Sequence, residues 1–308
     1  MTKRILITGA TGFIGRHALG PLADRGFEIY ALARDTARAA PAERVLWIPG
    51  NVLDMEATRR AMGQVQPTHL LHFAWYTVPG QYWSARENFT WTQASLDLLR
   101  SFHNAGGHRV VMVGTCAEYD WDLGLCSETV TPLAPHTTYG ICKHALQALL
   151  AAYTPGSGLT SAWGRVFFLY GPHEHPARLV PSVTRALLRG EPAQCTAGTQ
   201  QRDFLHVQDV ADAFVALLDS EVQGPVNIAS GQPIPVSHIV SHLADVIGRP
   251  DLLHLGAISL SPTESPLVYA DVQRLRDEVG WSPSIDLTSG LRNTVTWWQH
   301  HMKEEMHA

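Results

Sequence analysis

The chain has 308 residues, of which 45% are hydrophobic and 17% are charged. So few charges predict a compact globular protein rather than a disordered one, and the length is sufficient for a large buried core. The formal net charge of −5 attracts neither nucleic acid nor an anionic membrane surface, so we expect neither as a partner.

The cysteines and the apolar segments indicate the compartment. Four cysteines without CxxC spacing are typical of reduced thiols in a cytosolic protein. The residues after Met1 lead into a short strand rather than into a signal-peptide pattern, and no apolar run approaches membrane-spanning length. We therefore expect a cytoplasmic protein.

Short apolar strands alternate with helical segments through the first half of the chain. The predicted strands cover residues 4–10, 28–34, 68–74 and 108–114. Apolar strands separated by helices are typical of a parallel sheet with helices on both faces, the doubly wound α/β architecture. Beyond Gly171 prolines become frequent, which indicates a smaller, mixed α/β lobe at the C-terminal side.

A glycine-rich turn, TGATGFIG (residues 8–15), joins the first predicted strand to the first predicted helix. Glycines at this spacing allow a tight turn and close backbone approach to a pyrophosphate, which the helix N-terminus then faces. An ordinary strand-to-helix turn is the alternative; the position after the first strand favours a Rossmann-type dinucleotide site. The expected cofactor contacts in this turn are Gly9, Thr11, Gly12, Phe13, Ile14 and Gly15.

These patterns predict two domains. Residues 1–170 would form the dinucleotide-binding Rossmann domain, to which segments near 203–230 return. Residues 171–308 would form the smaller, substrate-binding lobe.

The end of the second predicted strand bears on the choice of cofactor. NAD-binding chains usually present an acidic residue there to the ribose 2′-OH, whereas an arginine accommodates the 2′-phosphate of NADP. Here the strand ends at Ala33 and Arg34, and Arg16 after the glycines could add positive charge. A solvated loop arginine beside Asp35 is the alternative, and we favour NADP over NAD.

The chemical end of the site is predicted from TTYGICK (137–143), in which Tyr139 and Lys143 are four residues apart. On a helix both side chains share one face. An ammonium beside a phenol lowers the phenol pKa, so we expect Tyr139 to exchange protons near neutrality. Thr115, at the end of the strand 109–113, is the third candidate, although a threonine that merely ends a strand is the alternative.

Taken together, these motifs resemble the extended short-chain dehydrogenase/reductase family, also described as the NAD-dependent epimerase/dehydratase family, in its nucleotide-sugar branch. The resemblance covers essentially the whole chain. Further matching segments are HFAW (72–75), ENFTWTQASLDLL (87–99), GRVFFLYGP (164–172), QRDFLHVQDVADAF (201–214), VNIASG (226–231) and VGWSP (279–283).

The resemblance implies a role for each site residue. Thr115 would bind the substrate oxygen, Tyr139 would exchange its proton, and Lys143 would hold the cofactor ribose. The remaining cofactor contacts would be Asn51 and Val52 at the adenine, with Phe73 and Ala74 near the nicotinamide. Arg202 would pair with the diphosphate of a nucleotide sugar. The implied substrate-binding residues are Trp75, Cys116, Phe168, Arg178 and Arg202.

The stretch GTCAEYDW (114–121) limits the reaction. Dehydratases of the family carry acids directly after the threonine, whereas Cys116 and Ala117 stand there in this chain. Glu118 falls one position late, and in a strand it would point to the opposite face. Dehydration is therefore not expected. The stretch resembles that of NADP(H)-dependent reductases of nucleotide-linked 4-keto-6-deoxyhexoses, which we favour over a 4-epimerase with bound NAD and over a non-enzymatic NADP-sensing protein.

Several features depart from the family pattern or extend it. Phe168 replaces an asparagine, and the second diphosphate arginine expected near 262–266 is absent. The predicted helices 91–106 and 139–154 have broad apolar faces, and the resemblance implies that they pair in the four-helix bundle of a homodimer. No metal site is expected, because the histidine pairs at 173/175 and 300/301 lack acidic or thiol partners in register.

Overall fold

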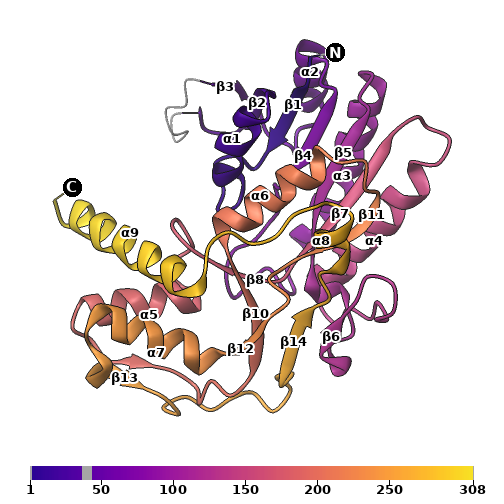
Figure 1. The fold of residues 1–308 in the computed structure, drawn as a ribbon. Helices are drawn as coiled ribbons and strands as arrows, with labels where there is room; N and C mark the ends of the chain where they lie inside the picture. The colour runs from indigo at the N-terminus through magenta and orange to yellow at the C-terminus, as the bar shows by residue number, and fades with distance from the viewer. Residues whose placement is uncertain (1, 37–43, 308) are drawn as a thin grey trace.

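The computed structural model describes residues 2–36 and 44–307, and its centre is a seven-stranded parallel sheet (Figure 1). The strands all run in the same direction, which confirms the predicted doubly wound α/β class. In spatial order they are β11 (Gly224–Ile228), β7 (Thr160–Val166), β5 (Arg109–Thr115), β4 (His69–His72), β1 (Arg4–Thr8), β2 (Glu28–Ala33) and β3 (Val45–Pro49).

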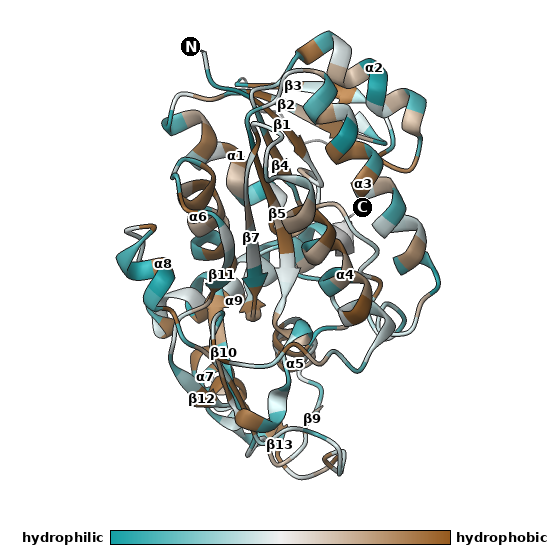
Figure 2. Ribbon diagram, turned by 90° about the vertical axis from the view of Figure 1, so that its right-hand side faces the viewer, coloured by the Kyte–Doolittle hydropathy of each residue, from teal (hydrophilic) through white to brown (hydrophobic). Residues whose placement is uncertain are grey.

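Helices cover both faces of this sheet (Figure 2). One face carries α1 (Gly15–Asp24) and α6 (Val207–Leu218), and the other carries α2 (Met55–Val65), α3 (Glu87–Asn104) and α4 (Thr138–Tyr153). Two separate apolar cores fill these layers, because the central strands are buried on both faces. None of the helices in the described ranges 2–36 and 44–307 is long and apolar enough to cross a membrane.

The strand order places the ligand crevice. The chain moves outward from β1 to β2 and β3, and then returns to β4 on the other side of β1. Ligands of doubly wound sheets bind at such a reversal, outside the carboxyl ends of the strands. The loops after β1, β4 and β5 therefore meet at one place.

A smaller lobe lies below the carboxyl ends of the large sheet (Figure 1). Its helices α5 (Leu179–Leu188), α7 (Val236–Ile247) and α9 (Leu287–His307) share an apolar core. Its strands are β6 (Leu125–Cys126), β8 (Phe168–Tyr170), β9 (Ala193–Gln194), β10 (Gln201–His206), β12 (Pro233–Pro235), β13 (Leu253–His254) and β14 (Leu267–Ala270). The short elements are α8 (Gln273–Asp277) and the 3₁₀ helices η2 (Cys116–Glu118), η3 (Trp121–Leu123) and η4 (Pro250–Leu252).

Candidate active site

The glycine turn after β1 has a geometry that only glycine fits. Gly9 has a φ of +74°, and a Cβ there would lie 2.8 Å from the backbone nitrogen of Ala74. A Cβ on Gly15 would lie 2.2 Å from the carbonyl oxygen of Gly9, which accepts the N–H of Gly12 at 2.9 Å. Because α1 begins at Gly15, its free N–H groups face this cradle, which suits the pyrophosphate of a dinucleotide.

Arg16 closes the same turn from the side of α1. Its guanidinium donates to the carbonyl oxygen of Thr11 at 2.8 Å and to that of Gly12 at 3.2 Å, and it is also hydrogen-bonded to His173. Phe13 and Ile14, the remaining residues of the turn, are half-buried. The guanidinium of Arg16 therefore holds the glycine turn together.

The residues predicted for the adenine end follow two adjacent strands. Arg34 is exposed directly after β2, and Asn51 follows β3, which pairs with β2 in register. The Asn51 side chain accepts the N–H of Leu53 at 3.1 Å, which shapes the loop. Val52 is buried in the apolar core between the sheet and α2. The structure thus brings an exposed arginine and a shaped loop to the same edge of the sheet.

Phe73 and Ala74 lie between the glycine turn and the chemical end. The backbone N–H of Phe73 donates to the carbonyl oxygen of Thr8 at 3.1 Å, and its ring meets Phe214 edge-on at 5.1 Å between centroids. Ala74 contacts the Thr8 hydroxyl through its N–H at 3.4 Å. This backbone path fixes the loop after β4 against the end of β1.

Thr115, Tyr139 and Gly140 show how β5 and α4 converge. Thr115 is the last residue of β5, and its side chain lies close enough to Tyr139, near the start of α4, to act on the pKa of the phenol. The cap of α4 is Thr137, whose hydroxyl accepts the N–H of Gly140 at 3.0 Å. A Cβ on Gly140 would lie 2.5 Å from the carbonyl oxygen of Ala117, so glycine permits this close approach. The two predicted hydroxyl groups therefore meet.

Lys143 lies one turn further along α4 and is 3% exposed. Its ammonium donates to the carbonyl oxygen of Val113 at 2.8 Å and lies 3.8 Å from the centroid of the Trp75 ring. Burial lowers the pKa of Lys143 to about 7, although the negative charge of Glu118 acts to raise it. The Trp75 indole N–H is itself held by the Asn88 side chain at 2.8 Å.

The expected lowering of the Tyr139 pKa is not seen in this structure. The pKa of Tyr139 is raised, first by burial and then by Tyr82, and Thr115 only partly offsets this. The Lys143 ammonium is turned to Val113 and Trp75 instead. Burial thus favours the protonated phenol of Tyr139.

Glu118 does not follow the expected strand geometry. The chain leaves β5 at Thr115 and forms η2, so Glu118 turns inward and is fully buried. Its carboxylate accepts the backbone N–H of Thr115 at 2.9 Å, the indole of Trp163 at 2.9 Å and the guanidinium of Arg165 at 2.8 Å. It is therefore bound away from the substrate side, which agrees with the expectation that it does not serve dehydration.

Asp120, for which the sequence offers no role, caps the next short helix. Its carboxylate accepts the N–H of Asp122 at 3.0 Å at the start of η3. The neighbouring Cys116 is buried, which raises the pKa of its thiol, and its carbonyl oxygen accepts the Trp121 indole at 2.7 Å. The thiol beside Thr115 is thus unreactive and contributes to packing only.

Arg202, the expected diphosphate partner, is buried in β10 and engaged within the protein. Its guanidinium forms an ion pair with Glu264, donates to the carbonyl oxygen of Ser265 at 2.7 Å and lies 5.4 Å from the centroid of the Phe168 ring. Phe168 thus occupies, as an aromatic platform, the position where the family carries an asparagine. A diphosphate would have to displace the Glu264 carboxylate, which is partly exposed.

Two aromatic residues that the sequence reasoning missed cover Tyr139. Tyr82 meets its ring edge-on at 5.0 Å and Trp83 at 5.8 Å, and the carbonyl oxygen of Trp83 accepts the N–H of Tyr139. Arg178 lies over Tyr82, 5.0 Å from the ring centroid, with a hydrogen bond of 3.4 Å to its hydroxyl. The cluster of aromatic residues in 75–83, after β4, was the sequence signal that could have indicated this cover.

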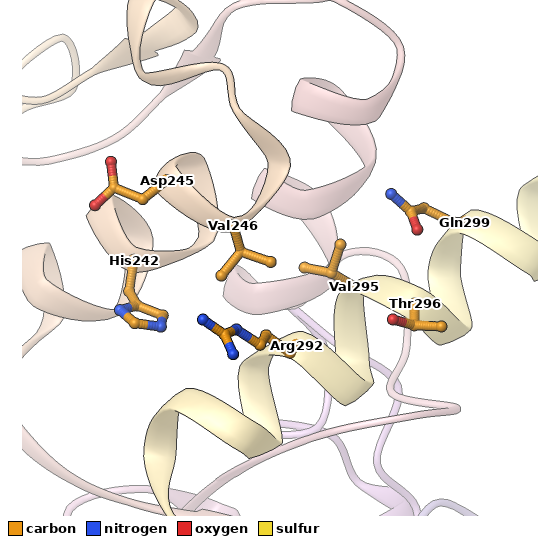
Figure 3. A pocket seen from close by; sticks show the side chains of 7 residues that line it. All are labelled: His242, Asp245, Val246, Arg292, Val295, Thr296 and Gln299. Atoms are coloured by element: carbon orange, nitrogen blue, oxygen red, sulfur yellow. The ribbon is translucent and has the colours of Figure 1, made fainter.

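A separate cavity lies between α7 and α9 in the smaller lobe (Figure 3). It has a volume of about 500 Å³, and none of its lining residues belongs to the predicted site. They are His242, Asp245, Val246, Arg292, Val295, Thr296 and Gln299. The predicted catalytic residues Thr115, Tyr139 and Lys143 lie instead at the carboxyl end of β5 and on α4.

Comparison with known proteins identifies the family. The chain is 28% identical over 336 residues to a UDP-glucose 4-epimerase of Azospirillum brasilense, covering 99% of this chain and 94% of that protein. It is 26% identical over 324 residues to a dTDP-glucose 4,6-dehydratase of Xanthomonas campestris pv. campestris, covering 95% and 92%. MoeE5, solved in complex with UDP-glucose and NAD, is 28% identical with a TM-score of 0.81 over 97% of this chain and 99% of that one. Residues 5–229 match the NAD dependent epimerase/dehydratase family, so the chain belongs to this family.

Proposed function

We propose that the protein is an enzyme that exchanges a hydride with one carbon of a nucleotide-linked hexose, as an NADP(H)-dependent reductase of a 4-keto-6-deoxyhexose. The observation that carries the proposal is the proximity of Thr115 and Tyr139 where β5 meets α4, with Lys143 one turn further along α4 and the glycine turn after β1 of the same sheet. Its relatives modify nucleotide sugars according to their names, which supports the substrate class.

The side chains suit reduction of a ketone. When bound, the nicotinamide supplies the hydride. Thr115 donates a hydrogen bond to the carbonyl oxygen, and Tyr139 gives that oxygen its proton. The raised pKa of Tyr139 keeps this proton in place at neutral pH, which is the starting state that reduction needs. Lys143 adds a positive charge near the developing alkoxide.

Elimination of water would need further groups. It requires a base beside C5 and an acid beside C6, but Cys116 and Ala117 offer a buried thiol and a methyl group. Glu118, the next carboxylate, is held by Trp163 and Arg165. These contacts support a reaction confined to one carbon.

A 4-epimerase with bound NAD is the second candidate, favoured by the relatives named as UDP-glucose 4-epimerases. Such an enzyme must first remove a proton from a sugar hydroxyl, so it would start from the Tyr139 phenolate.

The two candidates differ in cofactor use, and this can be measured. Given NADPH and a panel of dTDP-, GDP- and CDP-linked 4-keto-6-deoxyhexoses, we expect one sugar nucleotide to be reduced with one NADPH consumed per sugar. UDP-glucose without added cofactor should remain unchanged. Conversion of UDP-glucose to its 4-epimer without net NADPH consumption would refute the reductase, and a 4-keto-6-deoxy product from an NDP-hexose would show that dehydration occurs.

The preference for NADP is proposed on the basis of Arg34, which is exposed after β2 with Ala33 before it. Arg34→Ala should weaken NADPH binding by roughly 1.5–3 kcal/mol, because a charge-assisted contact to phosphate is lost. NADH binding should change little. Titration calorimetry with both cofactors measures the difference, and equal weakening of the two would refute the assignment.

A homodimer through α3 and α4 is proposed from their surface. Phe89 and Trp91 on α3, with Ile141 and Leu149 on α4, leave large apolar side chains partly or largely accessible on one side of the sheet. Multi-angle light scattering at micromolar concentration should give twice the chain mass, and charged substitutions at Phe89 and Ile141 should shift it toward the monomer. A monomeric wild-type protein would contradict this.

A further inference from the structure

A completely buried ion pair lies beneath Thr115. The carboxylate of Glu118, which is 0% exposed, receives the Nε–H of Arg165, which is 1% exposed, at 2.8 Å. The same carboxylate accepts the Thr115 backbone N–H at 2.9 Å. Burying two charges costs several kcal/mol per ion before their attraction is counted, so a buried pair is weak evidence for stability and calls for another explanation.

Trp163 links this carboxylate to the lysine of the site. The indole N–H of Trp163 donates to both Glu118 oxygens, at 2.9 and 3.2 Å, while the Lys143 ammonium lies 5.9 Å from the centroid of its ring. A Cβ on Gly114 would lie 2.6 Å from a Glu118 oxygen and 2.0 Å from the indole nitrogen. The glycine therefore allows the carboxylate to press directly against the end of β5.

The far side of the pair is anchored in a different part of the fold. Arg165 donates to the Tyr119 hydroxyl at 2.9 Å, and this hydroxyl donates to the Asn227 side chain at 2.8 Å. Asn227 belongs to β11, at the edge of the large sheet. The carboxylate is thus held from two sides and has little freedom to move.

We propose that Glu118 is a positioning residue: its buried carboxylate clamps the backbone of Thr115 and supplies the counter-charge for the Lys143 ammonium. This rests on the proposed roles of Thr115 and Lys143. Among the described residues, two titratable groups act on the ammonium: Glu118 from η2 and His72 from β4. His72 is neutral because burial lowers its pKa to about 3. Glu118, which is ion-paired with Arg165, supplies the opposing negative charge.

The charge can be tested without substrate, because the chain contains only three lysines, Lys3, Lys143 and Lys303. Protein labelled with ¹³C at lysine Cε gives three signals whose pH titrations can be followed by NMR. The wild-type Lys143 should titrate near its pKa of about 7. The midpoint should be about 1 pH unit or more lower in Glu118→Gln/Arg165→Met than in Arg165→Met, because these two variants differ only in the Glu118 carboxylate. The double substitution avoids leaving an unpaired buried guanidinium.

A matched control removes a neighbouring carboxylate. Glu128 accepts the Asn227 N–H at 2.8 Å at the far end of the same network. Glu128→Gln should leave the Lys143 midpoint where it is in the wild type. The same midpoint in Glu118→Gln/Arg165→Met and in Arg165→Met, or an equal fall in Glu128→Gln, would overturn the counter-charge.

The clamp is tested by a second pair of variants. Glu118→Gln/Arg165→Met keeps an oxygen that can accept the Thr115 N–H, whereas Glu118→Met/Arg165→Met does not. With the substrate that supports wild-type turnover, either NADPH with a 4-keto-6-deoxy sugar nucleotide or UDP-glucose, the second variant should lose roughly a further 10²-fold in kcat because Thr115 is displaced. Equal kcat in the two variants would overturn the clamp. If neither substrate supports wild-type turnover, the proposed function fails, while the NMR result still decides the counter-charge.

Discussion

Replacing Tyr139 by phenylalanine is expected to lower kcat by about 10²–10⁴-fold, the usual contribution of a positioned general acid. The variant loses the hydroxyl that is the proposed proton donor and that neighbours Thr115. The ring keeps its edge-on contacts with Tyr82 and Trp83, so the fold and the cofactor cradle should be preserved. Steady-state kinetics and cofactor titration calorimetry measure the two effects separately.

The same helix provides a matched control. Tyr153 ends α4, and its hydroxyl is hydrogen-bonded to His103 at 2.8 Å, far along the helix from Thr115. Tyr153→Phe removes an identical group and should leave kcat near that of the wild type. If Tyr139→Phe retained more than about a tenth of wild-type activity, another group would have to be the proton donor.

The sheet and the crevice could be predicted because they depend on local patterns. Apolar strands alternating with helices allow few arrangements. The spacing of Gly9, Gly12 and Gly15 follows from close backbone contacts within a single turn. The structure contains these contacts, because an added Cβ at Gly9 or Gly15 would collide with backbone atoms. The i,i+4 spacing of Tyr139 and Lys143 likewise follows from helix geometry alone.

The electrostatics of the site could not be predicted in the same way. Whether Lys143 lowers the pKa of Tyr139 depends on burial and on the competing contacts with Val113 in β5 and with Trp75 in the loop after β4. Trp163, on β7, gives no sign in the sequence that it meets Glu118. Local spacing predicts which helix or strand carries each of these groups. Their pKa values depend on neighbours that are distant in the sequence.

Glu118 shows the same limit in a single residue. If the strand continued past Thr115, the Glu118 side chain would point to the opposite face of the sheet from Thr115. The chain instead forms a capping box. In it the Thr115 hydroxyl accepts a backbone N–H of the following turn, and the Glu118 carboxylate accepts the backbone N–H of Thr115. The Thr-x-x-Glu spacing contained this signal, whereas the ion pair of Glu118 with Arg165, which lies on a distant strand, could not be predicted from it.

Arg202 shows how an assigned role can depend on a loop. Its position in β10 suits a diphosphate, yet in this structure its charge is met by Glu264. The second arginine of the family pattern is absent from the same loop. A nucleotide sugar that binds here must therefore exchange one carboxylate for its diphosphate, and the Arg202–Phe168 contact can persist while it does so.

The cofactor cradle should be the part of the site that is most sensitive to a small change. In Gly15→Ala the new Cβ would lie 2.2 Å from the carbonyl oxygen of Gly9, a backbone atom that cannot rotate away. Either the turn opens or α1 shifts, and such overpacking typically costs 1–3 kcal/mol. Because the moved atoms are those that would face the pyrophosphate, we expect cofactor affinity to fall by about 10–100-fold.

The control for this loss is a glycine with room around it. Gly63 lies inside α2, and a Cβ there would meet nothing within 4 Å. Gly63→Ala should raise the free energy of unfolding by about 0.5–1 kcal/mol, because alanine is the better helix former, and should leave cofactor binding unchanged. Titration calorimetry and chemical denaturation of both variants give the comparison. Wild-type cofactor affinity in Gly15→Ala would mean that the dinucleotide does not bind at this turn, since no bound pyrophosphate could tolerate the displaced Gly9 carbonyl without a cost.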